Sequence, residues 1–195
     1  MSHKILNAII THPINIHTIR SLIRKGENPD ARDFQGCTAL HYAAVNGKSA
    51  IVKLLLEAGA DPNARDNDNE TVLMWAAGEG QDATVQMLID AGADVNARGG
   101  FYEIFGYEST ALQWAVALHH NKTVRILLDA GADVNSPRAL IDAVYLGNTE
   151  VVRWLLDLGA DVNVKDNEGE TALMIAKRRE YDEIAQMLKK FGAEK

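Results

Sequence analysis

The sequence predicts an all-α protein built from stacked pairs of short helices. Three observations predict this fold: a glycine that recurs in a fixed frame, two short helical patterns before each such glycine, and small alanines on the first helix of each pair. The recurring glycines are Gly26, Gly59, Gly92, Gly131, Gly159 and Gly192. Six repeats result, at approximately residues 1–32, 33–65, 66–98, 99–135, 136–165 and 166–195, and we expect them to form a single domain over residues 1–195.

The first helix of each pair is defined most clearly after Thr38, which is placed to cap it. Leu40, Ala43 and Ala44 then face inward, and the Asn-Gly turn at Gly47 ends the helix. The second helix carries Ile51, Val52, Leu54, Leu55 and Leu56, and Gly59 is placed as its left-handed C-terminal cap. Helices of roughly 8 to 10 residues are unstable alone. Each repeat therefore buries its apolar faces only against the next.

The repeats share the frame D-x-x-G-x-T-x-L-x-x-A-A-x-x-G followed by V-x-x-L-L-x-x-G-A-D-x-N. This frame resembles the ankyrin repeat over essentially the whole chain. The resemblance implies a curved solenoid of helix pairs joined by β-hairpin fingers, and protein–protein binding through the concave surface. It does not imply a catalyst. The family's TPLH opening is present only as Thr38-Ala39-Leu40-His41, so we expect His41 to be structural.

The spacing of the repeats changes at one place. The starting residues Thr38, Thr71, Thr110, Arg138 and Thr171 are separated by 33, 39, 28 and 33 residues. One finger therefore gains six residues between Arg98 and Ser109, and the next junction loses five. There, Ser136 is placed as an N-cap and Pro137 as the first helical residue, which leaves no room for a hairpin. His119 stands where other repeats have glycine, which predicts a different turn.

The enlarged finger holds four aromatic residues, Phe101, Tyr102, Phe105 and Tyr107. One interpretation is that these rings cover the flank of the repeat that lacks a finger. The other is that some remain exposed and contact a partner, since Tyr and Phe supply large contact areas. Both can hold together.

A column of rings on the first helices points to the same face. Tyr42, Trp75 and Trp114 share one position, and Tyr145 lies one turn further along its own helix. These rings can pack between repeats or form part of a binding surface. The predicted fingertip rim consists of Phe34, Gln35, Asn67, Asp68 and Glu79, and we expect the site to centre on the third and fourth repeats.

Composition limits the partners. The 27 acidic and 20 basic residues give a net charge of −7, which disfavours nucleic acid and makes a basic protein partner the easier one to accommodate. No apolar run approaches the roughly 20 residues that span a bilayer, and no signal peptide pattern opens the chain. We therefore expect a cytoplasmic protein that binds no membrane, and a monomer. The single cysteine, Cys37, excludes an intramolecular disulfide.

Motifs for catalysis or metal binding fail on inspection. The segment DNDNE begins like a calcium loop, but Thr71 stands at the glycine position and Ala77 at the position of the glutamate. The pair His119-His120 lacks further ligands at metal spacing, and no phosphate loop or nucleophile motif occurs. We predict a non-catalytic protein-binding module with no cofactor and no metal. The alternatives are an inhibitor or immunity-type protein that neutralises a basic enzyme or toxin, and a regulatory subunit that binds a small ligand where the finger is missing.

Overall fold

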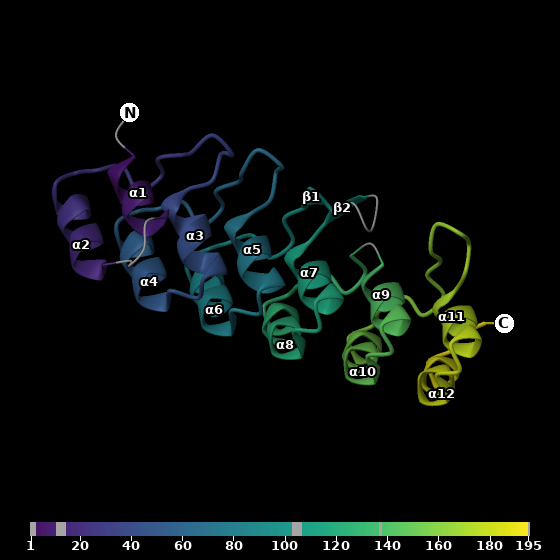
Figure 1. Cartoon of the computed structure of the whole chain (residues 1–195). Coiled ribbons are helices and arrows are strands. Elements are labelled where there is room, and N and C mark those ends of the chain that lie inside the picture. Colours follow the sequence, from purple (N-terminus) through teal and green to yellow (C-terminus); the bar gives the residue numbers. More distant parts are fainter. Residues whose placement is uncertain (1–2, 11–14, 103–106, 137, 195) are drawn as a thin grey trace. The chain divides into compact units, whose positions relative to one another are not determined.

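The computed structural model describes residues 3–10, 15–102, 107–136 and 138–194. The chain divides into two compact parts, Met1–Ala111 and Leu112–Lys195, which we call the N-terminal part and the C-terminal part and describe separately. The single domain predicted above stays a prediction. Within the described residues, twelve helices and a single two-stranded sheet form, so the predicted all-α solenoid of helix pairs is confirmed (Figure 1).

The helices alternate between seven and nine residues. The N-terminal part contains α1 (Lys4–Ile10), α2 (Ile16–Arg24), α3 (Ala39–Val45), α4 (Ser49–Glu57), α5 (Val72–Gly78), α6 (Asp82–Asp90), β1 (Gly99–Tyr102) and β2 (Tyr107–Ser109). The C-terminal part contains α7 (Ala111–Ala117), which starts at the boundary, α8 (Asn121–Asp129), α9 (Ala139–Tyr145), α10 (Thr149–Asp157), α11 (Ala172–Arg178) and α12 (Asp182–Lys190). The first helix of each pair is thus shorter than predicted.

The helix pairs stack in two rows within each part. In the N-terminal part α1, α3 and α5 pack in one row, and α2, α4 and α6 in the other (Figure 1). Ala43 and Ala44 of α3 are fully buried, as are Ala76 and Ala77 of α5, and their small side chains let these two helices approach closely. Leu55 is also fully buried. The core therefore lies between helices of successive repeats, as the apolar pattern predicted.

Left-handed residues end both helices of a repeat. Gly59 has φ +85°, and the Ala60 amide donates to the Leu55 carbonyl at 3.0 Å, which confirms the predicted cap. Between the two helices Gly47 has φ +60°, and His119 has φ +61°. The prediction that His119 turns differently is therefore wrong. The backbone keeps the same turn, and the clash of the His119 Cβ with the following carbonyl oxygen costs about 1–2 kcal/mol.

The fingers differ in size as the spacing predicted. We number them as the first finger (residues 32–38), the second finger (65–71), the enlarged finger (99–109) and the last finger (165–171). The first, second and last are closed by the bridges Arg32↔Thr38, Arg65↔Thr71 and Lys165↔Thr171. In the enlarged finger β1 and β2 pair antiparallel, with Gly99 opposite Ser109 and an irregularity after Gly99.

The repeat that starts at Arg138 shows no such bridge within the described residues. Its helix α9 begins at Ala139, with Arg138 as N-cap at φ +70°, so the prediction of Ser136 as N-cap is wrong. The reason is an extra turn, in which the Ala139 amide donates to the Ser136 carbonyl at 3.1 Å before the helix starts. Pro137, predicted as the first helical residue, lies outside the described residues.

None of the described helices has the length and apolar character needed to cross a bilayer.

Candidate protein-interaction surface

One aspartate organises each regular finger. Asp66 accepts hydrogen bonds through Oδ1 from the amides of Asp68 at 3.0 Å and Glu70 at 2.9 Å, which closes the second finger. Asp33 does the same in the first finger, and Asp166 in the last. In each case Oδ2 remains for a donor outside the finger loop.

In the N-terminal part this donor is a ring from the column predicted from sequence. The Tyr42 hydroxyl donates to Asp33 Oδ2 at 2.7 Å. Trp75 Nε1 donates to Asp66 Oδ2 at 3.1 Å and to Glu70 Oε2 at 2.8 Å. Burial and the hydrogen bond to Asp33 raise the pKa of Tyr42 above its ordinary value. The rings therefore tie the first and second fingers to the first helix of their own repeats.

The same rings pack on one another and remain partly exposed. Trp75 meets Tyr42 edge to face, with ring centroids 6.1 Å apart, and both side chains are half-buried. Packing is therefore observed for Tyr42 and Trp75 within the N-terminal part, and binding through their exposed edges stays a prediction.

His41 lies beneath these rings and is fully buried. Its Nδ1 accepts a hydrogen bond from the Thr38 amide at 3.1 Å, and its ring meets Trp75 edge-on at 5.4 Å. Burial lowers the pKa of His41 to about 4, although the charge of Asp66 acts in the opposite direction. The histidine is neutral at pH 7 and holds the helix start, as expected.

Neighbouring fingers of the N-terminal part are hydrogen-bonded to each other. The Asn67 amide donates to the Gln35 carbonyl at 2.9 Å, and Asn67 Nδ2 donates to the Phe34 carbonyl at 2.9 Å. The Gly100 amide donates to the Asp68 carbonyl at 3.2 Å. The guanidinium of Arg65 donates to the Arg98 carbonyl at 2.8 Å. The fingers form one connected row.

The two glycines at the start of the enlarged finger permit its close contact with the second finger. A Cβ on Gly99 would overlap the carbonyl oxygen of Asn69, and a Cβ on Gly100, which has φ +63°, would lie 2.8 Å from the Glu70 side chain. The base of the enlarged finger is therefore packed against the second finger.

Phe34, at the tip of the first finger, is 89% exposed. It borders a groove of about 650 Å³ beside α1, which we call the α1 groove. Its walls are His3, Leu6, Asn7, Ile10, Arg32, Asp33, Phe34 and Tyr42. An exposed ring beside an apolar groove is typical of an interaction site.

Not every residue predicted for the rim lies there. Glu79 is the C-cap of α5, so the seven-residue helix separates it from the second finger, and its prediction as a fingertip residue is wrong. Glu70 was missed by the sequence analysis, although its position five residues before Trp75 could have indicated a carboxylate at the start of the same helix.

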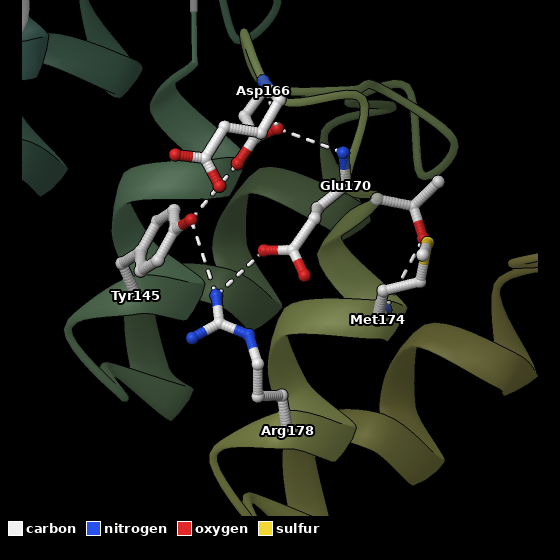
Figure 2. A network of polar contacts seen from close by, with 7 residues as sticks. Tyr145, Asp166, Glu170, Met174 and Arg178 are labelled. Carbon is white, nitrogen blue, oxygen red and sulfur yellow. Dashed lines mark hydrogen bonds and ion pairs between the residues drawn. The ribbon is translucent and has the colours of Figure 1, made fainter.

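In the C-terminal part the ring that donates a hydrogen bond to the aspartate of the last finger is Tyr145. Figure 2 shows its hydroxyl pointing to Asp166, with an O–O distance of 3.0 Å, although Asp166 belongs to the next repeat. Arg178 Nη2 lies 2.7 Å from Glu170 Oε2, and Arg179 lies over the Tyr145 ring at 5.2 Å. The pKa of Asp166 lies below its ordinary value. Burial acts to raise this pKa, but the hydrogen bonds donated by the Glu170 amide, the Tyr145 hydroxyl and the loop amide outweigh burial.

The predicted residues thus fall into two groups. Phe34, Tyr42, Asn67, Asp68 and Trp75 lie together in the N-terminal part, whereas Trp114 and Tyr145 lie on α7 and α9 of the C-terminal part. The backbones of Phe101, Tyr102 and Tyr107 form the hairpin, but their side chains, and all of Phe105, lie outside the described residues. The choice between the two interpretations of these four rings stays a prediction.

Within the described part of the chain no group of three or more His, Cys, Asp or Glu is placed to hold a metal ion. Cys37 is buried, and burial raises the pKa of its thiol to about 11, which keeps it protonated at pH 7.

Comparisons with known proteins agree with this architecture. The family model described as ankyrin repeats (3 copies) matches residues 6–99, the ankyrin repeat model matches 107–138, and the model for ankyrin repeats (many copies) matches 127–176. A search of curated protein sequences gives no match. Among solved structures, the ankyrin repeat domain of Bcl-3, described as a unique member of the IkappaB protein family, is similar with 27% identity and a TM-score of 0.83. The alignment covers 100% of this chain and 87% of that chain.

Proposed function

This chain belongs to the ankyrin repeat family, whose repeats serve as protein-interaction modules, and from that premise we propose that it is a non-catalytic module that binds one protein partner. The proposed surface consists of the face of α3 and α5 that carries Tyr42 and Trp75 and of the finger row of the N-terminal part, and it is continued by the enlarged finger. A monomeric state and a cytoplasmic location are part of the proposal.

The observation that carries this proposal is Phe34, an 89% exposed ring beside the α1 groove. Burying a phenylalanine is worth about 1.5–3 kcal/mol, so a ring left in water at the edge of a groove favours binding on contact with an apolar partner group. Tyr42 and Trp75 continue the same surface and are already held in place by their hydrogen bonds to Asp33 and Asp66. Such preorganised rings lose little entropy on binding.

Inhibition of an enzyme, neutralisation of a toxin and scaffolding would all use this surface in the same physical way. The net charge of −7 favours a basic partner among them.

A cavity next to the shortened junction before α9 supports a second candidate function, the binding of a small ligand. A cavity of about 350 Å³ lies between the 134–140 and 161–164 segments of the C-terminal part, and Ser136 lines it. Ser136 is 5% exposed, and its Oγ has no hydrogen-bond partner within the described residues. Thermal melts of wild type and Ser136→Ala with a small-molecule library test this candidate: a shift that requires Ser136 supports it, and none at millimolar concentrations removes it.

Capture of partners from the native host tests the main proposal. Phe34→Ser is expected to reduce recovery of the specific partner, and deletion of residues 99–108 tests the enlarged finger. Phe191→Ser is the matched control, since Phe191 is an exposed ring of the C-terminal part at 39% exposure. Equal recovery with Phe34→Ser and wild type would remove the first finger from the site. A reaction catalysed by the purified chain would overturn the non-catalytic assignment.

A further inference from the structure

The α1 groove has an apolar floor on one side and a fingertip on the other. Leu6 of α1 is 2% exposed, and Ile10, one turn later, is 45% exposed. Phe34 closes the opposite side of the groove. The apolar surface of Ile10 and Phe34 is left to water in the isolated chain, and a large apolar side chain would cover both.

Two polar side chains along this groove, Arg32 and Asp33, are already occupied within the protein. The Arg32 guanidinium donates to the carbonyls of Gly36 and Arg65. The Asp33 carboxylate accepts from two amides of its own finger and from the Tyr42 hydroxyl. A partner group in the groove therefore gains little from hydrogen bonds with Arg32 or Asp33, and Leu6, Ile10 and Phe34 offer it apolar contacts instead. His3 Nδ1 has no hydrogen-bond partner among the described residues.

Charge is unbalanced along the adjoining fingers. Residues 1–111 contain 14 acidic and 9 basic residues, a net charge of −5. In segments 30–38 and 61–71 the two guanidiniums of Arg32 and Arg65 both donate to backbone carbonyls. The carboxylates of these segments are Asp30, Asp33, Asp61, Asp66, Asp68 and Glu70.

Three carboxylates of the second finger, Asp66, Asp68 and Glu70, lie close to one another, and two of them accept hydrogen bonds from Trp75. Burial, followed by the charges of Asp66 and Asp68, raises the pKa of Glu70 above its ordinary value. No ion pair to these three carboxylates occurs among the described residues. A cation placed next to Glu70 would relieve this repulsion, and Trp75 lies at its side, hydrogen-bonded to it.

We propose that the partner is recognised through a short cationic segment: a large apolar side chain enters the α1 groove against Ile10 and Phe34, and neighbouring lysine or arginine side chains lie against Glu70 and Asp68 beside Trp75. This inference rests on the proposed function and specifies its ligand. The Trp75–Tyr42 ring contact, at 6.1 Å, connects the two subsites within the N-terminal part.

A random 12-residue peptide library displayed on phage is the probe, selected against the whole chain. We expect the selected peptides to be enriched in Lys or Arg together with Leu, Ile, Phe or Trp. A synthetic copy of the best peptide should bind about tenfold or more weakly to Phe34→Ser. It should bind several-fold more weakly to the double variant Glu70→Gln, Asp68→Asn, and lose most of its salt dependence there.

The variants are chosen to leave the fold intact. Phe34 is almost fully exposed, and a glutamine at position 70 retains an oxygen acceptor for Trp75 Nε1. Phe191→Ser and Glu168→Gln are the matched controls in the C-terminal part, since Glu168 holds the finger position that corresponds to Asp68. Neither control should change the affinity.

The outcomes separate this inference from the function on which it rests. Selected peptides that are neutral or acidic but depend on Phe34 overturn the cationic segment and leave the proposed surface in place. Peptides that bind equally to wild type and Phe34→Ser overturn both. Failure to select any peptide overturns the short segment, while partner capture that still depends on Phe34 would retain the protein-binding function.

Discussion

Acid sensitivity of the N-terminal part should depend on His41. An unfolded histidine has a pKa of 6.5, whereas burial lowers the pKa of His41 to about 4 in the folded chain. Because the folded pKa is the lower one, the neutral histidine contributes stability above pH 6.5 that is lost as the pH falls toward 4. The complete loss corresponds to about 3 kcal/mol, and at pH 5 it amounts to about 2 kcal/mol.

Replacement by glutamine removes this titration while fitting the site. Gln113 stands at the position of His41 in its own repeat and is fully buried there. Trp75 is a suitable reporter because its ring lies 5.4 Å from the His41 ring. A background of Trp114→Phe and Trp154→Phe leaves Trp75 as the only tryptophan.

Urea unfolding followed by Trp75 fluorescence at pH 7.5 and pH 5.0 gives the comparison. Between pH 7.5 and pH 5.0 the free energy of unfolding should decrease in both proteins, and the decrease should be about 2 kcal/mol smaller in His41→Gln than in the parent with His41. Carboxylates that titrate in both chains cancel in this difference. The same pH dependence in both proteins would refute the assignment of His41 as a buried, neutral histidine.

Three further changes test the packing and polar contacts by denaturant unfolding. Leu88→Ala should cost about 2 to 5 kcal/mol because Leu88 is fully buried, whereas Leu118→Ala, at a side chain 41% exposed, should cost far less; equal costs would contradict the assigned core. Ser136→Ala should stabilise by about 1 kcal/mol, since it removes a buried hydroxyl without a partner in the described structure, and a loss of stability would indicate that the hydroxyl is satisfied. Tyr145→Phe should cost about 1 kcal/mol through the lost hydrogen bond to Asp166, and an unchanged midpoint would contradict that bond.

Local sequence signals predicted most of the fold. The helix pairs, the cap at Gly59 and the changes in finger length follow from glycine and alanine positions that recur in each repeat, because such positions fix backbone conformation within a few residues. The structural role of His41 could be predicted for the same reason, because its hydrogen-bond partner Thr38 is only three residues away in the sequence.

The sequence-based predictions were wrong or incomplete in two situations. In one, the backbone adopts a conformation that the residue type does not favour, and in the other, the hydrogen-bond partner is distant in the sequence. His119 takes a left-handed conformation that suits glycine, because the two helices it joins demand that turn. Ser136 is a good N-cap residue by type, yet the shortened junction places a turn between it and α9. Tyr145 and Asp166 are 21 residues apart, so no short motif could have paired them. Glu79 was predicted at the rim, but it lies at the far end of α5, one helix away from the second finger.

The attachment of the enlarged finger has a consequence for how new specificities can arise. Its base is fixed by Gly99 and Gly100 against the second finger, and Ser109 Oγ donates to the Gly99 carbonyl at 3.3 Å across the hairpin. Both of these described contacts lie at the ends of the insertion. A loop of other sequence placed between these ends would keep both contacts, which makes this hairpin a natural position for grafting new loops onto the same repeats.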